Sequence, residues 1–173
     1  MYFGMIVDGR TDYPIIAAVV AAVFGDLATP SYLQPQRDQI TGRFTHKVGW
    51  SNVKAWCEET AGIGGWNERL YDLDFLLVQL DADVLDQPQF NRISDLKSLC
   101  DTVKAWVDTG PPPRGVVITL PKRSTDTWLL AALSPQRRPD AEALPTRCVL
   151  EILEARGVLK NQYDYREHAP AIT

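Results

Sequence analysis

The chain has 173 residues, of which 45% are apolar and 23% are charged, a balance typical of a globular protein with a hydrophobic core. This composition excludes a disordered chain, a collagen-like repeat and a disulfide-rich scaffold. The formal net charge of -4 does not indicate binding of nucleic acid through bulk electrostatics. Carboxylates neutralised by bound cations would change that balance, so the charge leaves the partner open.

The sequence offers no membrane-spanning segment and no disulfide framework. Its longest apolar run, residues 15–24, is much shorter than the roughly 20 residues that a transmembrane helix needs. The N-terminal residues lack the pattern of a secretory signal, which predicts a cytoplasmic protein without a membrane partner. Cysteines stand far apart and form no C-x-x-C pair, so we interpret them as core thiols: Cys57, Cys100 and Cys148.

The N-terminal region predicts a buried strand followed by a helix. Residues 2–7 are almost wholly apolar, and the Asp-Gly-Arg that follows ends the strand. Apolar residues then recur at helical spacing up to Phe24, and Gly25 ends the helix. Thr11 or Asp12 is expected to cap its first turn, and Asp12 has the alternative of an outer-shell metal ligand, with the cap favoured.

The next region is less regular. Residues 27–49 contain prolines and many polar residues, which predicts a loop with one irregular strand around Tyr32 or Phe44. Ser51 then caps a helix that ends in the glycine-rich stretch 61–65. That stretch lacks the Gly-Lys-Ser/Thr ending of a phosphate-binding loop, so we interpret it as a connector.

The second half alternates strands with helices. Two near-continuous apolar runs predict buried strands, and three amphipathic segments predict helices. Alternation of this kind predicts one α/β domain with a mostly parallel sheet flanked by helices. The strands are expected at 75–80 and 116–120, and the helices at 93–106, 126–133 and 146–156.

Carboxylates follow three of the predicted strands. Asp8 follows the first strand, Asp81 and Asp83 follow the strand at 75–80, and Asp126 lies just beyond the strand at 116–120. Ligands of open α/β sheets bind where the carboxyl ends of parallel strands meet, so we expect these side chains at one edge. Carboxylate oxygens suit Mg²⁺ or Mn²⁺, and such a site predicts phosphoryl chemistry.

Three motifs together resemble a known family. The segment DGRTD at 8–12, which leads into an apolar helix, resembles the acidic-Gly-x-Thr-acidic opening of TOPRIM-fold proteins, and LDAD at 80–83 is similar to their D-x-D motif. The segment TDTWLLAA at 125–132 resembles the Glu-x-Trp-Leu-Leu-Ala segment of small stand-alone TOPRIM-like proteins of the DUF4276 kind. These are relatives of the TOPRIM nuclease half of overcoming-lysogenization-defect proteins. The resemblance covers residues 2 to about 133, with the C-terminal helix and tail (144–173) outside it.

The resemblance implies a divalent-metal-dependent nuclease or phosphotransferase with Mg²⁺ or Mn²⁺ as cofactor. Asp81 and Asp83 would bind one or two ions, and Asp8 would serve as general base or second-metal ligand. Asp126 would complete the metal shell. Asp8 and Asp126 stand where the family usually has Glu, which shortens both side chains by one methylene and puts activity in question.

The implied partner is nucleic acid, either DNA or RNA, and basic residues near the carboxylates would contact its phosphates. These are Lys122 and Arg123, with a solvated loop as the alternative, and Arg10. Relatives of this kind act in bacterial defence or mobile elements, so a separate ATPase or other defence protein is an expected partner by analogy. The apolar helices and tryptophans leave room for a homodimer surface.

Two other readings of the same residues stay open. One is a TOPRIM-like module whose site has decayed and which serves as a binding or regulatory subunit of a larger complex. The other is a phosphatase of the haloacid-dehalogenase type, with Asp81 as nucleophile and Asp83 as acid/base. That type expects a hydroxyl residue at position 85, where this chain has Leu85.

Overall fold

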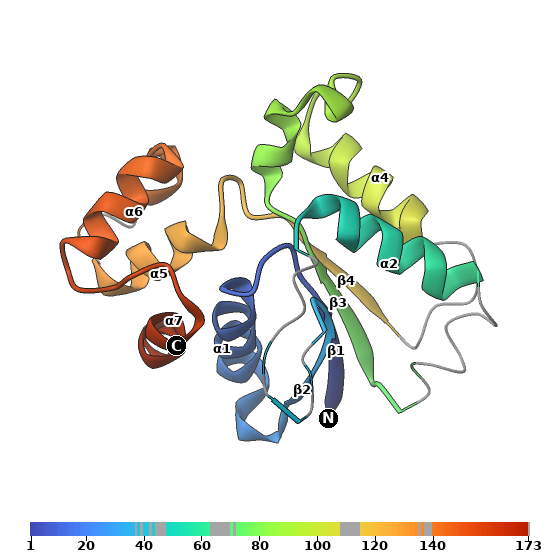
Figure 1. Ribbon diagram of the computed structural model, residues 1–173, viewed down its shortest axis with the longest axis horizontal. Helices are drawn as coiled ribbons and strands as arrows, with labels where there is room; N and C mark the ends of the chain where they lie inside the picture. The colour runs from blue at the N-terminus through green and yellow to red at the C-terminus, as the bar shows by residue number, and fades with distance from the viewer. Residues whose placement is uncertain are drawn as a thin grey trace.

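The computed structural model describes residues 1–36, 38, 40–41, 43, 48–62, 70, 72–107, 115–134, 136 and 140–172 (Figure 1). At its centre is a four-stranded sheet with the order β2-β1-β3-β4, in which every neighbouring pair is parallel. The strands are β1 (Tyr2–Ile6), β2 (Thr29–Gln34), β3 (Phe75–Gln79) and β4 (Val116–Thr119). The predicted α/β class with a parallel sheet is therefore confirmed.

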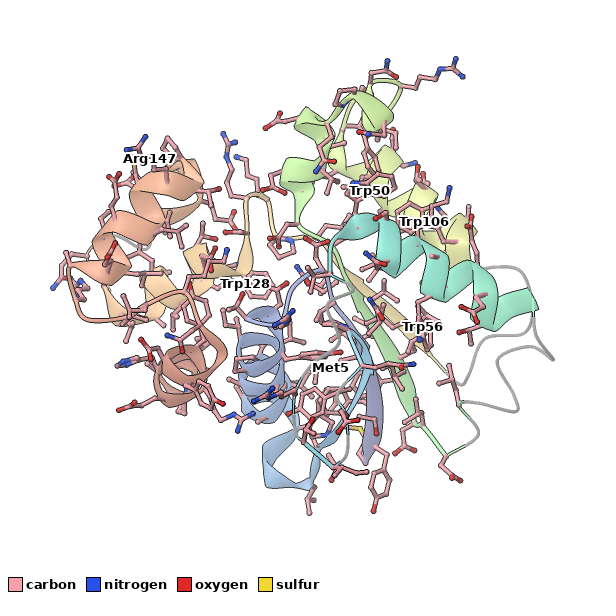
Figure 2. All side chains as sticks on the ribbon, viewed as in Figure 1. Met5, Trp50, Trp56, Trp106, Trp128 and Arg147 are labelled. Carbon is pink, nitrogen blue, oxygen red and sulfur yellow. The ribbon has the colours of Figure 1, made fainter. Side chains whose placement is uncertain are left out.

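Helices cover both faces of the sheet (Figure 1). α1 (Asp12–Phe24) lies on one face, and α2 (Trp50–Gly62) and α4 (Leu96–Val107) lie on the other. Successive strand residues point to opposite faces, so Leu76 packs in the core beneath α2 and α4, whereas Leu77 packs in the core beneath α1. Figure 2 shows the same division, with Trp50, Trp56 and Trp106 on the α2–α4 side and Trp128 on the α5 side.

The C-terminal part of the chain forms a third layer outside α1. It comprises α5 (Thr125–Leu133), α6 (Thr146–Glu154), α7 (Gln162–His168) and the 3₁₀ turn η6 (Ala169–Ile172). A separate apolar cluster joins this layer to α1, and it contains Ile15, Leu129, Leu153 and the fully buried Tyr165. The segment around Tyr165, expected only as a tail, forms the helix α7.

Most predicted helices and strands begin and end close to the bounds that the structure gives. The α1 helix ends at Gly25, whose φ of 70° is the left-handed region that glycine adopts without strain. The strand expected around Tyr32 is present as β2, which pairs parallel to β1 with one register shift, although Pro30 and the polar residues around it lower strand propensity. The sequence misses the 3₁₀ turn η2 (Ala82–Asp86). The position of the alternative strand near Phe44 and the connector residues 63–65 lie outside the described residues, whereas Gly62 ends α2.

Within the described ranges, no helix has both the length and the apolar character that crossing a membrane requires.

Candidate functional site

The carboxyl ends of β1 and β3 and the start of α5 bring five aspartates together. Burial and the negative charges of Asp12, Asp8, Asp83 and Asp126 together raise the pKa of Asp81 to about 9, with burial the larger cause. Charges act on one another in this way only when they lie close together. The three stretches of chain that the sequence singles out therefore meet at one edge of the sheet.

A buried glutamine links the ends of β1 and β3. Gln79 is fully buried, its Oε1 accepts a hydrogen bond from the backbone N–H of Asp8 at 3.1 Å, and its Nε2 donates to Asp81 Oδ1 at 2.7 Å. The side-chain amide thus holds the two aspartates in a fixed relation across neighbouring strands. No motif marks Gln79; the only signal in the sequence is a polar residue near the end of an otherwise apolar strand.

Asp8 is the least satisfied member of the cluster. Its Oδ1 is buried and has no hydrogen-bond partner among the described residues. Burial raises the pKa of Asp8 to about 7, and the charges of Asp12 and Asp83 raise it while that of Lys160 lowers it. A buried carboxylate oxygen without a partner is energetically costly, so it marks a position where a cation or a proton would be bound favourably.

Asp12, in contrast, has a partner on each oxygen. Its Oδ2 accepts from the backbone N–H of Gly9 at 2.7 Å, and its Oδ1 accepts from the hydroxyl of Thr125 at 2.6 Å. Burial raises its pKa to about 6, although both hydrogen bonds oppose this. Asp12 therefore closes the loop between β1 and α1 and ties it to α5. It does not cap the helix, because Thr11 is the N-cap residue and makes no side-chain cap bond.

Asp126 is held by three donors. It is 1% exposed and accepts from Ser124 Oγ at 3.2 Å, Lys160 Nζ at 2.7 Å and Tyr165 Oη at 2.6 Å. Sequence analysis expects Asp126 in the metal shell. Its contacts instead favour a clamp that fastens the segment between α6 and α7 onto the sheet edge, because both of its oxygens are already engaged.

Lys160 places an ammonium beside the aspartate cluster, and no motif in the sequence marks it. Its burial lowers its pKa, but the charge and hydrogen bond of Asp126 and the charges of Asp12 and Asp81 more than offset this and raise it. Lys160 also acts on Asp83, whose pKa it lowers against the effect of burial. The sequence signal is weak, because position 160 lies in a polar turn far from every motif.

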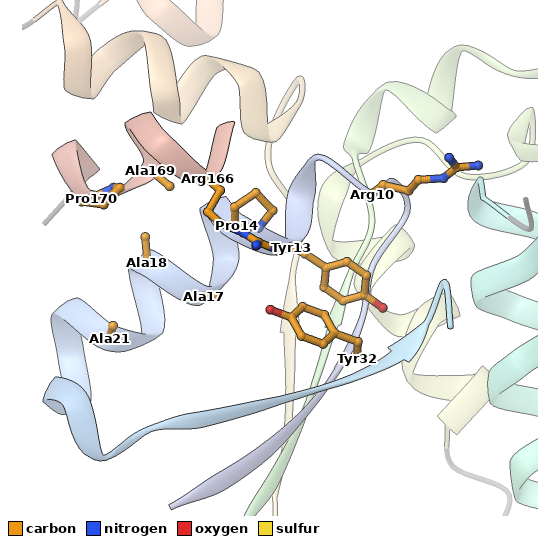
Figure 3. A pocket seen from close by; sticks show the side chains of 10 residues that line it. All are labelled: Arg10, Tyr13, Pro14, Ala17, Ala18, Ala21, Tyr32, Arg166, Ala169 and Pro170. Carbon is orange, nitrogen blue, oxygen red and sulfur yellow. The ribbon is translucent and has the colours of Figure 1, made fainter. Parts of the chain in front are cut away.

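The three expected phosphate-binding residues lie in different places. Arg123 is half-buried and its charge lowers the pKa of Asp83, so it faces the cluster. Lys122 is exposed. Arg10 lines a separate pocket beside α1, and Figure 3 shows its guanidinium directed away from Tyr13 and Tyr32.

The donor set suits a hard divalent cation that is shared with solvent and substrate. In the described part of the chain, no three acidic, histidine or cysteine side chains are arranged to hold one ion by themselves. Asp8 nevertheless keeps a buried oxygen without a hydrogen-bond partner among the described residues, and Asp81 and Asp83 lie beside it. Mg²⁺ commonly takes only one or two carboxylates and completes its shell with waters and phosphate oxygens, so these residues fit such an ion.

Comparison of the chain with models of known families gives no match, and neither the curated proteins nor the solved structures contain a match.

Proposed function

We propose that the protein is a TOPRIM-like enzyme that cleaves phosphodiester bonds of DNA or RNA with the help of Mg²⁺ or Mn²⁺. The observation that supports this most directly is the buried Oδ1 of Asp8, which lacks a partner among the described residues and lies among Asp81, Asp83 and Lys160. An acidic cluster with an unpartnered oxygen and a neighbouring ammonium has the charges needed for both a metal ion and a phosphate. The parallel α/β sheet and the position of the site at its carboxyl edge are consistent with this function.

The residues divide the work according to their contacts. Asp81 and Asp83 would hold the ion, with Gln79 fixing the orientation of Asp81. When bound, the ion supplies a Lewis acid that polarises the phosphorus centre and lowers the pKa of a bound water. Asp8 would accept the proton of the attacking water through its open oxygen.

Two cations would stabilise the negative charge that develops on the phosphate. Lys160 lies 2.7 Å from Asp126, which holds its ammonium beside the aspartate cluster. Arg123 acts on Asp83 from the loop that precedes α5. Charged donors held in place near a phosphate act without reorganising during the reaction. Asp126 is then a positioning residue, because it acts through Lys160.

The test is cleavage of labelled single-stranded and duplex DNA and RNA with Mn²⁺. The Asp81→Asn variant should lose at least about 10²-fold in rate, because misplacing a reacting group by about 1 Å already costs that much. Asp140→Asn, an exposed aspartate outside the cluster, is the matched control and should cleave like the wild type. Cleavage by Asp81→Asn at the wild-type rate would contradict the proposal.

A second candidate function is a TOPRIM-like binding or regulatory subunit without catalysis. The observation that favours it is that Asp12 and Asp126 are engaged in hydrogen bonds, and that no three described side chains form a metal cage. Titration calorimetry with Mg²⁺ and Mn²⁺ separates the two functions. Binding that Asp81→Asn and Asp83→Asn weaken supports the enzyme, whereas a wild-type protein that binds neither ion supports the subunit.

A further inference from the structure

A pocket of about 250 Å³ lies between α1, β2 and the C-terminal turn, apart from the aspartate cluster (Figure 3). It shares one segment with that cluster, because Arg10 and Tyr13 line the pocket while Asp12 between them belongs to the cluster. No carboxylate lines it. Its described lining consists of small, aromatic and basic residues: Arg10, Tyr13, Pro14, Ala17, Ala18, Ala21, Tyr32, Arg166, Ala169 and Pro170.

The walls of the pocket are apolar and rigid. Ala17, Ala18 and Ala21 present only methyl groups from one face of α1, which leaves a flat surface on that helix. On the other side, the rings of Tyr13 and Tyr32 meet edge to face with their centroids 4.6 Å apart. The Tyr13 hydroxyl donates to the carbonyl of Pro35 at 2.8 Å, which fixes this wall. A flat, largely apolar group fits between such walls.

A cation lies at the mouth of the pocket. Arg166 of α7 is exposed, and Figure 3 shows its side chain beside Pro14 at the rim. Among the described residues, no carboxylate forms an ion pair with it. A planar guanidinium beside a flat apolar surface suits a ligand that joins a ring to an anionic group, and a nucleotide has both.

We propose that this pocket holds one nucleotide of the substrate strand, with its base against the alanine surface and Tyr32 and its phosphate on Arg166. The proposal deepens the proposed function and rests on nucleic acid being the substrate. A volume of about 250 Å³ is of the size of one nucleotide, so the proposal concerns a single, unpaired nucleotide of the strand. The pocket and the cluster share the segment around Asp12. The nucleotide in the pocket would therefore belong to the same strand as the cleaved bond, at some distance from that bond.

The test measures binding without chemistry. Fluorescence anisotropy follows labelled 12-nucleotide single strands of DNA and RNA in EDTA, so that no cleavage occurs. Ala18→Leu fills the pocket with a residue that keeps helix propensity, and Arg166→Gln removes the cation. Each variant should raise the Kd about 5- to 20-fold, and Arg166→Gln should also reduce the salt slope by about 0.7. Arg92→Gln, an exposed arginine outside the pocket, should bind like the wild type.

The outcomes separate this proposal from the proposed function. If neither Ala18→Leu nor Arg166→Gln weakens binding, the proposal that the pocket holds a nucleotide is overturned, even if metal-dependent cleavage is found. Binding that both variants weaken, in a wild type that cuts nothing with Mn²⁺, would support the pocket and overturn the nuclease. Competition by free AMP with the affinity of the strand would also overturn the proposal, because the pocket would then take free nucleotides.

Discussion

Two halves of the aspartate cluster differ in how their oxygens are used. Asp12 and Asp126 are buried and fully hydrogen-bonded, and they tie α5 and the C-terminal segment to the end of β1. Asp8, at the end of β1, keeps a buried oxygen without a partner in the described part of the chain, and Asp81, at the end of β3, accepts one hydrogen bond, from Gln79. The hydrogen bonds thus separate the aspartates that tie elements together from those that are open to the proposed metal ion.

The largest expected effect is a loss of unfolding free energy in the variant Asp126→Ala. Asp126→Ala removes the acceptor of Ser124, Lys160 and Tyr165 at once, and leaves the buried Tyr165 hydroxyl without that partner. Breaking a buried ion pair on one side costs about 3–5 kcal/mol. Lys160 is half-exposed, so we expect the lower end, about 3 kcal/mol of unfolding free energy.

Urea denaturation of Asp126→Ala measures this loss, with Asp140→Ala as the exposed control. The thermal midpoint should fall by roughly 6–12 °C, since 1 kcal/mol corresponds to about 2–4 °C in a chain of this size. A loss no greater than that of Asp140→Ala would mean that the Asp126 clamp does not hold the C-terminal layer.

A smaller effect is expected at Thr125, which donates to the buried Asp12. Thr125→Val should cost about 1.5–3 kcal/mol, because the hydroxyl bonds a charged acceptor. Thr127 offers a matched comparison on the same helix, since its hydroxyl donates to the neutral carbonyl of Ser124 at 2.7 Å. Thr127→Val should cost about 0.5–1.5 kcal/mol. Equal losses of unfolding free energy in the two variants would show that the hydrogen bond to Asp12 stabilises the fold no more than the one to the Ser124 carbonyl.

The last expected effect is a dependence of stability on pH, and it comes from Asp8 and Asp81. The pKa values of Asp8 and Asp81 are raised to about 7 and about 9, far above the unfolded value of 3.8. The folded protein therefore keeps protons that the unfolded chain has released, and the metal-free protein should lose stability as pH rises from about 5 towards 9.

Thermal unfolding in EDTA across this pH range checks the prediction. Asp81→Asn should flatten the dependence and stabilise the metal-free protein at pH 8, although it removes the proposed metal ligand. Added Mg²⁺ should restore wild-type stability most at high pH, because it replaces the protons. If the stability of the metal-free wild type did not change with pH, the close approach of the buried carboxylates of Asp8 and Asp81 would be contradicted.

The site could be anticipated only in part before the fold was known. Asp8, Asp81 and Asp83 are visible because each follows an apolar run, and parallel strands end at a common edge. Lys160 is not visible, because it lies 34 residues from Asp126 in a polar turn with no motif. Gln79 cannot be predicted either, because a single polar residue near a strand end has many explanations.

By itself, the sequence determined the elements with strong periodicity and the places where the chain delivers carboxylates. Hydrophobic spacing sets α4 and α6, whose apolar residues fall on one face, because burial of one face is a local property of the pattern. Only the tertiary structure decided which aspartates are satisfied, which cation neutralises them and which pocket lies beside them. Those outcomes depend on contacts between residues far apart in the chain, such as Thr125 with Asp12, and no local pattern encodes such distances.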